Sequence, residues 1–211
     1  MCDLSRSPII RTAPAPLTAL LAAADLEHAA EDLWVFGYGS LMWRPGFDFV
    51  ERVEARLTGA HRALCVYSFV HRGTPERPGL VLGLDRGGTC QGIAFRVAAA
   101  DRAKTVSYLR AREQVTAVYR ESVRRISLKR EPHRQVPALC YMVDRGHPQY
   151  AGRLPVAEQL HHIRQGHGQS GASCATVRRG TFFSALSQAS VPHLFPALIR
   201  SILRRTHDRQ C

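Results

Sequence analysis

The sequence lacks the cysteine patterns of zinc-binding and redox proteins. Its six cysteines are scattered, and no two of them form a Cys-x-x-Cys pair. The spacings of common zinc sites and of thioredoxin-like motifs are therefore absent. Three of the cysteines lie inside apolar, strand-like runs, where we expect buried small hydrophobic residues: Cys65, Cys90 and Cys140. This cysteine usage fits a reducing cytoplasm.

The sequence also has no long hydrophobic run. No apolar stretch approaches the roughly 18 residues of a membrane span, and the N-terminus lacks the continuous apolar core of a secretory signal. With 45% hydrophobic and 22% charged residues over 211 positions, the composition is that of a globular protein able to bury a core without a disulfide or metal. We expect a cytoplasmic protein that does not contact membranes.

Acidic residues are few relative to basic ones. The chain has 29 Lys+Arg against 17 Asp+Glu, a formal net charge of +12. Such a surface attracts anions and can bind nucleic acid non-specifically. The basic residues are mostly scattered arginines, however, whereas a dedicated nucleic-acid site has a clustered stripe. We expect a solvated, arginine-rich surface and no specific nucleic-acid partner.

Three neighbouring histidines do not match a metal site. His161 and His162 are adjacent on a predicted helix and point in different directions. His162 and His167 are five residues apart, which fits no zinc template. We expect surface histidines and no metal site.

The apolar pattern predicts an α+β fold. Strands are expected over residues 33–36, 50–57, 64–70, 80–84, 91–97, 115–128 and 136–143. The pair 80–84 and 91–97 is expected to form a hairpin around residues 85–88, and a turn is expected at Gly59. Helices are expected over 98–112, with Asp101 as N-cap, and over 156–164. Strands in hairpins with a few helices are typical of α+β proteins.

The domain organisation is expected to be simple. Residues 1–32 are an N-terminal extension with a short helix over 17–30, residues 33–205 form a single domain, and residues 206–211 are a tail. The extension contains several acidic residues, which argues against a transit peptide. Residues 181–205 are expected to be helical in part, because two prolines interrupt the pattern.

The segment WVFGYGSLMW, residues 34–43, is the most informative stretch. A buried strand is followed directly by Gly37-Tyr38-Gly39-Ser40. Glycines there allow the backbone to approach a ligand closely, and successive N–H groups in such a turn can hold a carboxylate or phosphate. The Ser40 hydroxyl can donate or accept a hydrogen bond. The alternative interpretation is a tight turn that ends a strand.

Three segments resemble the ChaC-type γ-glutamylcyclotransferases. They are FGYGSLMWRPGF at residues 36–47, HRGTPERPG at 71–79 and YLRARE at 108–113. A fourth, looser match runs from residue 150 to 171, so the resemblance covers roughly residues 33 to 180 in the family's order. It implies a small, mostly antiparallel β-barrel with peripheral helices.

The resemblance also implies a reaction. The family cyclises a γ-glutamyl group: its free α-amine attacks the γ-amide carbonyl, which forms 5-oxoproline and releases an amine. Because nucleophile and electrophile belong to one molecule, the enzyme needs no side-chain nucleophile and no cofactor. It needs to fold the substrate into attack geometry and to move a proton, which one carboxylate can do. The implied substrate is glutathione or another γ-glutamyl amine.

The resemblance assigns roles to particular residues. Glu113, at the end of the YLRARE segment, corresponds to the catalytic glutamate. The substrate's α-carboxylate and amine would be held by Tyr38, Gly39, Ser40 and Leu41. Other glutamates, including Glu121, are expected to be solvated surface charges.

Three further residues are candidate substrate ligands with ordinary alternatives. The planar guanidinium of Arg72 could pair with a carboxylate, or it could stabilise its loop. Tyr119 and Tyr141 could offer hydroxyls to the site, or they could be core tyrosines whose hydroxyls are satisfied within the protein.

The chain departs from the family pattern at two places. Where the family often has glycine shortly after the glutamate, this sequence has Thr116-Ala117-Val118-Tyr119. Further on, Ser173 replaces an asparagine, and Cys174-Ala175-Thr176 lacks the aromatic residue that usually follows. Glutathione and other γ-glutamyl amines therefore both remain open as substrates. The sequence also leaves the oligomeric state open.

Two other classes of protein compete with the enzyme. One is a non-catalytic protein of the same fold, either a γ-glutamyl-ligand binder or a regulator of cation transport. Retention of Glu113 favours the enzyme. The other is an arginine-rich nucleic-acid binder, which the absence of a clustered basic helix disfavours.

Overall fold

The computed structural model describes residues 30–130 and 134–175. Its main strands are β1 (Leu33–Gly37), β2 (Glu51–Ser68), β3 (Gly79–Val97), β4 (Tyr119–Leu128) and β5 (Arg134–Val143). Its α-helices are α2 (Arg102–Glu113) and α3 (Val156–Gln165). Four short elements complete it: η2 (Ser40–Met42), η3 (Ala99–Asp101), β6 (His167–Gly168) and β7 (Gly171–Ala172). The helical segments expected within 17–29 and 181–205, and the tail, lie outside the described residues.

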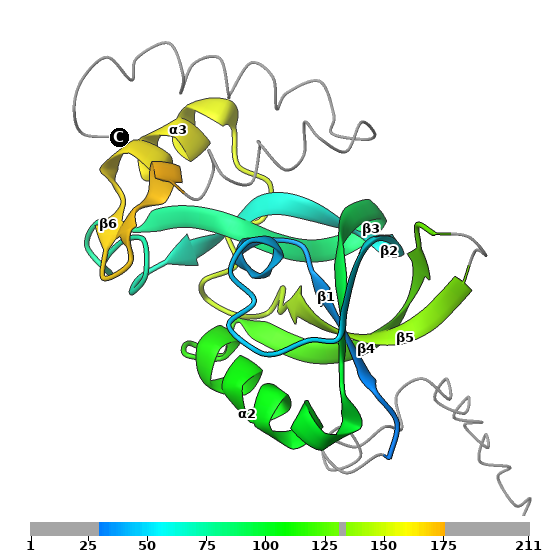
Figure 1. Cartoon of the computed structure of the whole chain (residues 1–211). Coiled ribbons are helices and arrows are strands. Elements are labelled where there is room, and N and C mark those ends of the chain that lie inside the picture. The colour runs from blue at the N-terminus through cyan, green and yellow to red at the C-terminus, as the bar shows by residue number, and fades with distance from the viewer. Residues whose placement is uncertain (1–29, 131–133, 176–211) are drawn as a thin grey trace, which may run out of the picture.

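The five main strands form a closed barrel in the order β1-β3-β2-β4-β5 (Figure 1). β1 pairs antiparallel with β3 and closes the barrel by parallel pairing with β5 at Val35↔Leu139. The β2–β3, β2–β4 and β4–β5 pairings are antiparallel. The predicted small, mostly antiparallel barrel with peripheral helices is confirmed.

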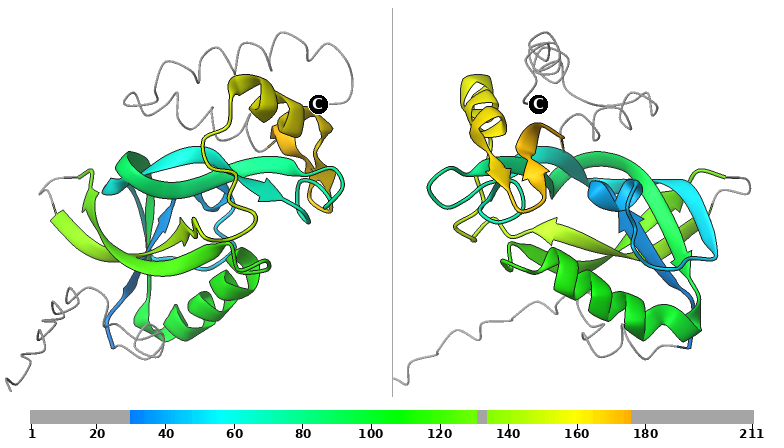
Figure 2. Two further views of the ribbon diagram at one scale, coloured as in Figure 1. Left: turned by 180° about the vertical axis from the view of Figure 1, so that it is seen from behind. Right: turned by 60° about the vertical axis from the view of Figure 1, so that its left-hand side comes forward.

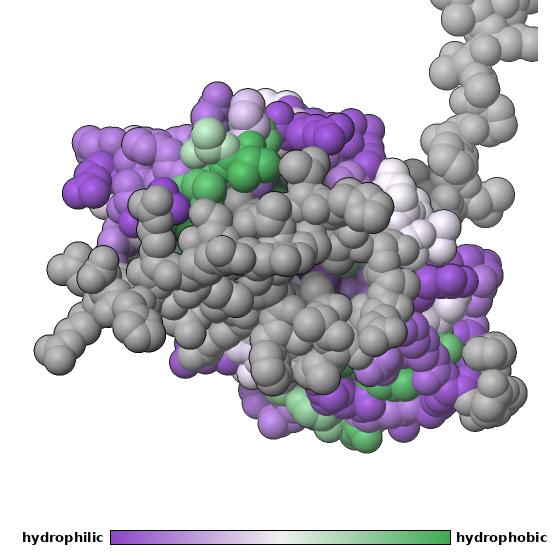
Figure 3. All heavy atoms as spheres, turned by 90° about the horizontal axis from the view of Figure 1, so that it is seen from above, coloured by the Kyte–Doolittle hydropathy of each residue, from purple (hydrophilic) through white to green (hydrophobic). Residues whose placement is uncertain are grey.

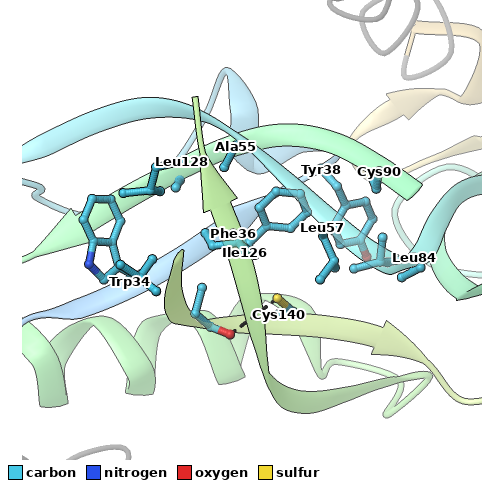
Figure 4. Packing of buried hydrophobic residues seen from close by; sticks show 14 residues of the cluster. Trp34, Phe36, Tyr38, Ala55, Leu57, Leu84, Cys90, Ile126, Leu128 and Cys140 are labelled. Atoms are coloured by element: carbon cyan, nitrogen blue, oxygen red, sulfur yellow. Dashed lines mark hydrogen bonds between the residues drawn. The ribbon is translucent and has the colours of Figure 1, made fainter. Parts of the chain in front are cut away.

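The period of two along β1 divides its side chains between two cores. Trp34 and Phe36 belong to a cluster that contains Leu57 of β2 and Ile126 of β4. Figure 4 shows Trp34 at one end of this cluster and Tyr38, beside Leu84 and Cys90, at the other. Leu33 and Val35 face the opposite way and pack with Val106 and Leu109 of α2. Every residue of β1 is buried for this reason.

The positions of β2 and β3 correct two sequence-based expectations. The predictions of a turn at Gly59 and of a hairpin around residues 85–88 were both wrong. β2 and β3 run continuously through these points as a long antiparallel pair. Gly59 (φ +86°) and, opposite it, Gly87 (φ +91°) and Gly88 (φ +71°) form an irregularity in the ladder. Left-handed glycines bend the paired strands there without reversing them. The true hairpin loop is residues 69–78.

The two α-helices lie on opposite sides of the barrel. Figures 1 and 2 show α2 against one side, and α3 with β6 and β7 on the other. α2 agrees closely with the predicted helix; Asp101 stands at its N-cap position, although its side chain makes no capping hydrogen bond. The following strand begins at Tyr119 and not at residue 115, since a turn intervenes in which Ala117 has φ +57°. α2 therefore ends just before a turn that leads back into the barrel.

The face shown in Figure 3 carries mainly hydrophilic residues among those described, with small hydrophobic areas. Within residues 30–130 and 134–175, no helix is both long enough and apolar enough to cross a bilayer. Cys65, Cys90 and Cys140 are buried free thiols, as the sequence predicted.

Candidate active site

A cleft of about 440 Å³ opens beside the end of α2. Its walls come from the segment after β1, the loop after β2, the turn after α2, and strands β3, β4 and β5. All eight residues selected from the sequence line this cleft: Tyr38, Gly39, Ser40, Leu41, Arg72, Glu113, Tyr119 and Tyr141. The structure thus brings residues that are up to 103 positions apart (141 − 38) into one site.

Arg62 of β2 forms hydrogen bonds that hold the turn after β1 in place. Its Nε donates to the carbonyl of Tyr38 at 2.6 Å, and an Nη donates to the carbonyl of Gln91 at 2.6 Å. The same Nη lies 3.5 Å from Sδ of Met42. Sequence analysis missed Arg62, because its partners lie 24 and 29 residues away and no local pattern reports them.

Gly39 lies outside the left-handed region, but its ψ of −129° is also outside the usual extended and helical regions. Its φ is −125°, and a Cβ built on it would meet no protein atom within 4 Å. The tighter glycine of this turn is Gly37, where a Cβ would lie 3.1 Å from Cβ of Leu41. Gly39 lines the cleft, so we expect the lack of a side chain there to matter for a ligand.

Gly39→Ala is therefore expected to fold normally and to bind substrate less well. Its Cβ would meet no protein atom within 4 Å, and Gly39 lines the cleft, where we expect the γ-glutamyl group to bind. We expect a melting temperature lowered only slightly by the unusual ψ, and a KM for glutathione raised several-fold, with kcat less affected. Unchanged KM would show that the ligand does not approach Gly39.

Glu113 is the last residue of α2 and faces the cleft. Its side chain is 17% exposed, and Oε1 lies 3.2 Å from Nε of Arg112. Burial raises the pKa of Glu113 above its usual value, and the Arg112 charge only partly opposes this. The charge of Glu113 acts on three tyrosines. Burial, followed by charged or ionisable neighbours that include Glu113, raises the pKa of each: Tyr38, Tyr119 and Tyr141.

The raised pKa of Glu113 predicts a pH-dependent effect on stability. The buried carboxyl favours its neutral form, so its contribution is fully present below the ordinary pKa of 4.5 and is lost as pH rises through the folded-state pKa. Glu113→Gln, which is always neutral, should increase the free energy of unfolding at neutral pH. Urea unfolding should show this gain shrinking to nothing below pH 4.5. A gain that is constant from pH 4 to 8 would contradict it.

Arg112 connects the turn after β1 to the end of α2, where Glu113 lies. One Nη donates to Ser40 Oγ at 2.9 Å, and the other donates to the carbonyl of Arg44 at 2.6 Å and to that of Pro45 at 3.0 Å. The same guanidinium also contacts Glu113, so one arginine side chain bonds both the Ser40 hydroxyl and the Glu113 carboxylate. Sequence analysis did not assign this role, although Arg112 lies inside the YLRARE segment.

Arg72 makes the contacts of a loop-stabilising residue. One Nη donates to the carbonyl of Ser170 and to that of Ala172, the latter at 3.2 Å, so β7 and the β6–β7 turn are tied to the loop after β2. Arg72 also lines the cleft, so pairing with a substrate carboxylate stays a prediction. Ser173, which replaces the family's asparagine, is buried; its Oγ donates to the carbonyl of Leu80 at 2.7 Å and accepts from its N–H at 3.1 Å.

Tyr119 and Tyr141 line the cleft, and their hydroxyls are hydrogen-bonded within the protein. Tyr119 donates to the carbonyl of Leu82 at 3.0 Å, and Tyr141 donates to Oε1 of Glu121 at 3.1 Å. Glu121 is 14% exposed and pairs with both Nε (2.8 Å) and an Nη (3.1 Å) of Arg110. The expectation that Glu121 is a solvated surface charge was wrong, because this network buries it between α2 and β5.

Among the described residues, no group of three or more His, Cys, Asp and Glu side chains could hold a metal ion. His162 lies 3.2 Å through Nδ1 from the carbonyl of Pro78, while His161 and His167 are exposed. The absence of a cofactor requirement stays a prediction from the proposed chemistry.

The five-stranded barrel with its peripheral helices has the γ-glutamylcyclotransferase-like fold. The chain belongs to the ChaC-like family: the family model described as ChaC-like protein matches residues 33–191. A crystal structure of the glutathione-specific γ-glutamylcyclotransferase from yeast superimposes with a TM-score of 0.72 at 20% identity, over 85% of this chain and 99% of that one.

Sequence relatives agree with this assignment. The glutathione-specific γ-glutamylcyclotransferase 1 of Danio rerio is 31% identical over 189 residues, which cover 85% of this chain and 96% of the relative. The glutathione-specific γ-glutamylcyclotransferase of Escherichia coli is 36% identical over 118 residues, 56% of this chain. The match spans half the length of that bacterial relative.

Proposed function

We propose that this protein is a γ-glutamylcyclotransferase that cleaves glutathione into 5-oxoproline and cysteinylglycine. The observation that carries the proposal is the position of Glu113, a shielded carboxylate with a raised pKa on the wall of the cleft beside the turn after β1. A pKa shifted toward neutrality suits a group that must first accept a proton and then return it.

The reaction replaces one C–N bond by another and moves two protons from the attacking amine to the departing amine. Glu113 takes a proton from the substrate's α-ammonium, and the freed amine nitrogen attacks the γ-carbonyl carbon. The new C–N bond closes the five-membered ring, and the amide C–N bond to cysteine breaks. Glu113 returns the proton to the departing amine, which regenerates the carboxylate. The ring nitrogen loses a second proton as it becomes the lactam N–H, and the released amine takes up that proton to become an ammonium. Folding the glutamyl chain so that amine and carbonyl meet supplies much of the rate, as intramolecular effective molarities reach ~10⁵ M or more.

Glutathione is the substrate that the relatives and the cleft favour. Relatives from Danio rerio and Escherichia coli are both named as glutathione-specific, and a volume of about 440 Å³ lies in the range that accommodates small ligands. The guanidinium groups of Arg44, Arg72 and Arg112 border the cleft and suit a substrate with two carboxylates. A net charge of +12 assists capture of an anion, within the limits of salt screening. A cytoplasmic location, where glutathione and reduced thiols are found, belongs to the same proposal.

The proposal is tested by incubation with glutathione, γ-glutamyl-alanine and γ-glutamyl-lysine, with chromatographic detection of 5-oxoproline. We expect product from glutathione and much less from the other two. Product mainly from γ-glutamyl-alanine or γ-glutamyl-lysine would keep the reaction class and change the substrate. No 5-oxoproline from any of the three would refute the enzyme and leave a ligand-binding protein of the same fold, which calorimetry with glutathione would then detect.

A further inference from the structure

The hydroxyl protons of two cleft tyrosines are already committed. A phenol has one proton to donate and lone pairs that accept. The partner of Tyr119 is a backbone carbonyl, Leu82, which can only accept. The partner of Tyr141 is the carboxylate of Glu121, whose two oxygens also accept hydrogen bonds from Arg110. The direction of both hydrogen bonds is therefore fixed, with the tyrosine donating in each.

This fixed direction decides what the tyrosines offer a ligand. Both line the cleft, and with its proton turned away each can present only lone pairs to it. Glu113 is the third acceptor, because it lines the same cleft as both tyrosines. An ammonium group has three N–H donors and no acceptor. Two phenolic oxygens and one carboxylate thus match the hydrogen-bonding needs of a primary ammonium.

We propose that Arg110 and Glu121 are positioning residues that make Tyr141 a hydrogen-bond acceptor, so that Tyr141, Tyr119 and Glu113 together hold the α-ammonium of the γ-glutamyl substrate. This inference rests on the proposed function and extends it to residues outside the cleft. The site thereby selects a free, cationic α-amine, and Glu113 is placed to take one of its protons. Ligands whose α-amine is absent or acylated should bind more weakly to the wild-type protein than glutathione does, since the acceptors would be left without a donor.

The backbone places Arg110, Glu121 and Tyr141 within reach of one another. Glu121 and Tyr141 are directly opposite each other in the β4–β5 ladder, so their side chains project from the same face. Arg110 lies three residues before Glu113, nearly one turn earlier on α2, and reaches Glu121 from there. One helix end therefore supplies both the catalytic carboxylate and the arginine that orients its neighbour.

Glu121→Gln is the decisive variant because it disturbs the group that accepts the Tyr141 proton. Oε1 of Glu121 accepts from both Tyr141 and Nε of Arg110, and Oε2 accepts from an Nη of Arg110. In Glu121→Gln one of these two positions becomes an NH₂ group, which faces an Arg110 donor in either orientation of the amide. The acceptor is thereby lost or displaced, and the Tyr141 proton is free to turn into the cleft, where it opposes an ammonium. We expect kcat/KM for glutathione to fall by about tenfold or more, the scale of a hydrogen bond to a charged group.

Glu51→Gln is the matched control. Glu51 is also a strand glutamate, is 18% exposed and pairs with Arg96 at 2.9 Å and with Arg130, but it does not line the cleft. We expect it to keep the wild-type kcat/KM. Equal losses in Glu51→Gln and Glu121→Gln would point to a general effect of losing a buried charge and would overturn the inference.

Two readouts separate positioning from structural support. Glu121→Gln should have no further effect in a Tyr141→Phe background, where no hydroxyl is left to orient. Inhibition by glutaryl-cysteinylglycine, which is glutathione without its α-amine, should not weaken in Glu121→Gln, because this analogue makes no ammonium contact. Additive losses in the double variant, or parallel loss of inhibition and turnover, would overturn the inference. Wild-type protein that forms no 5-oxoproline would instead refute the proposed function.

Discussion

Glu113→Gln is expected to lower kcat for glutathione by ~10²–10⁴-fold, the usual cost of losing a general acid–base group. Glutamine has nearly the shape of glutamate but cannot accept and return a proton at neutral pH. The substrate's ammonium then keeps its proton and cannot attack, and the departing amine receives none. Because proton transfer matters more in the transition state than in the bound ground state, KM should change much less than kcat.

The measurement is steady-state formation of 5-oxoproline by wild type and variant, with melting temperatures recorded for both. Glu158→Gln is the control, since Glu158 is exposed on α3 and is not part of the cleft. Glu121 would be a poor control, because it contacts Tyr141. A Glu113→Gln protein that forms product at close to the wild-type rate would move the proton carrier elsewhere in the cleft.

The cleft could be located from the sequence because its chemistry is carried by short, continuous segments. The turn at 37–41 and the glutamate that ends α2 are each recognisable within a dozen residues, and the barrel brings them together. The residues that hold these segments in place could not be found in this way. The contact from Arg62 to Tyr38, like that from Glu121 to Tyr141, joins residues 20 or more positions apart.

The same limit explains the errors in the fold. Glycine at position 59 and the pair at 87–88 have the local composition of turns, and sequence analysis placed a strand end at each. In the structure they lie opposite each other in one long ladder. Only the pairing partner distinguishes a bend in two paired strands from two reversals of the chain. The end of helix α2 was predicted to within one residue and its start four residues too early, because a helix is determined by neighbours three and four positions away.

Arg62→Met is expected to damage stability and activity together. Methionine keeps much of the aliphatic volume of arginine but donates no hydrogen bond, so the carbonyls of Tyr38 and Gln91 lose this donor. Leaving such groups unsatisfied costs about 1–3 kcal/mol each, so the free energy of unfolding should fall by about 2–4 kcal/mol. Urea unfolding measures this loss, and Arg56→Met, an exposed arginine of the same strand, should show almost none.

The effect of Arg62→Met on turnover follows from where the freed carbonyl lies. Tyr38 directly precedes Gly39 and Ser40, which line the cleft, and Arg62 bonds its carbonyl from the β2 side of the turn. Without that bond the turn loses its fixed position relative to Glu113, and a displacement of about 1 Å can cost ~10²-fold in an intramolecular reaction. We expect kcat/KM to fall even at temperatures where the variant is fully folded. A folded Arg62→Met protein with wild-type kcat/KM would mean that Arg112, which bonds Ser40 from the other side, holds the turn in place alone.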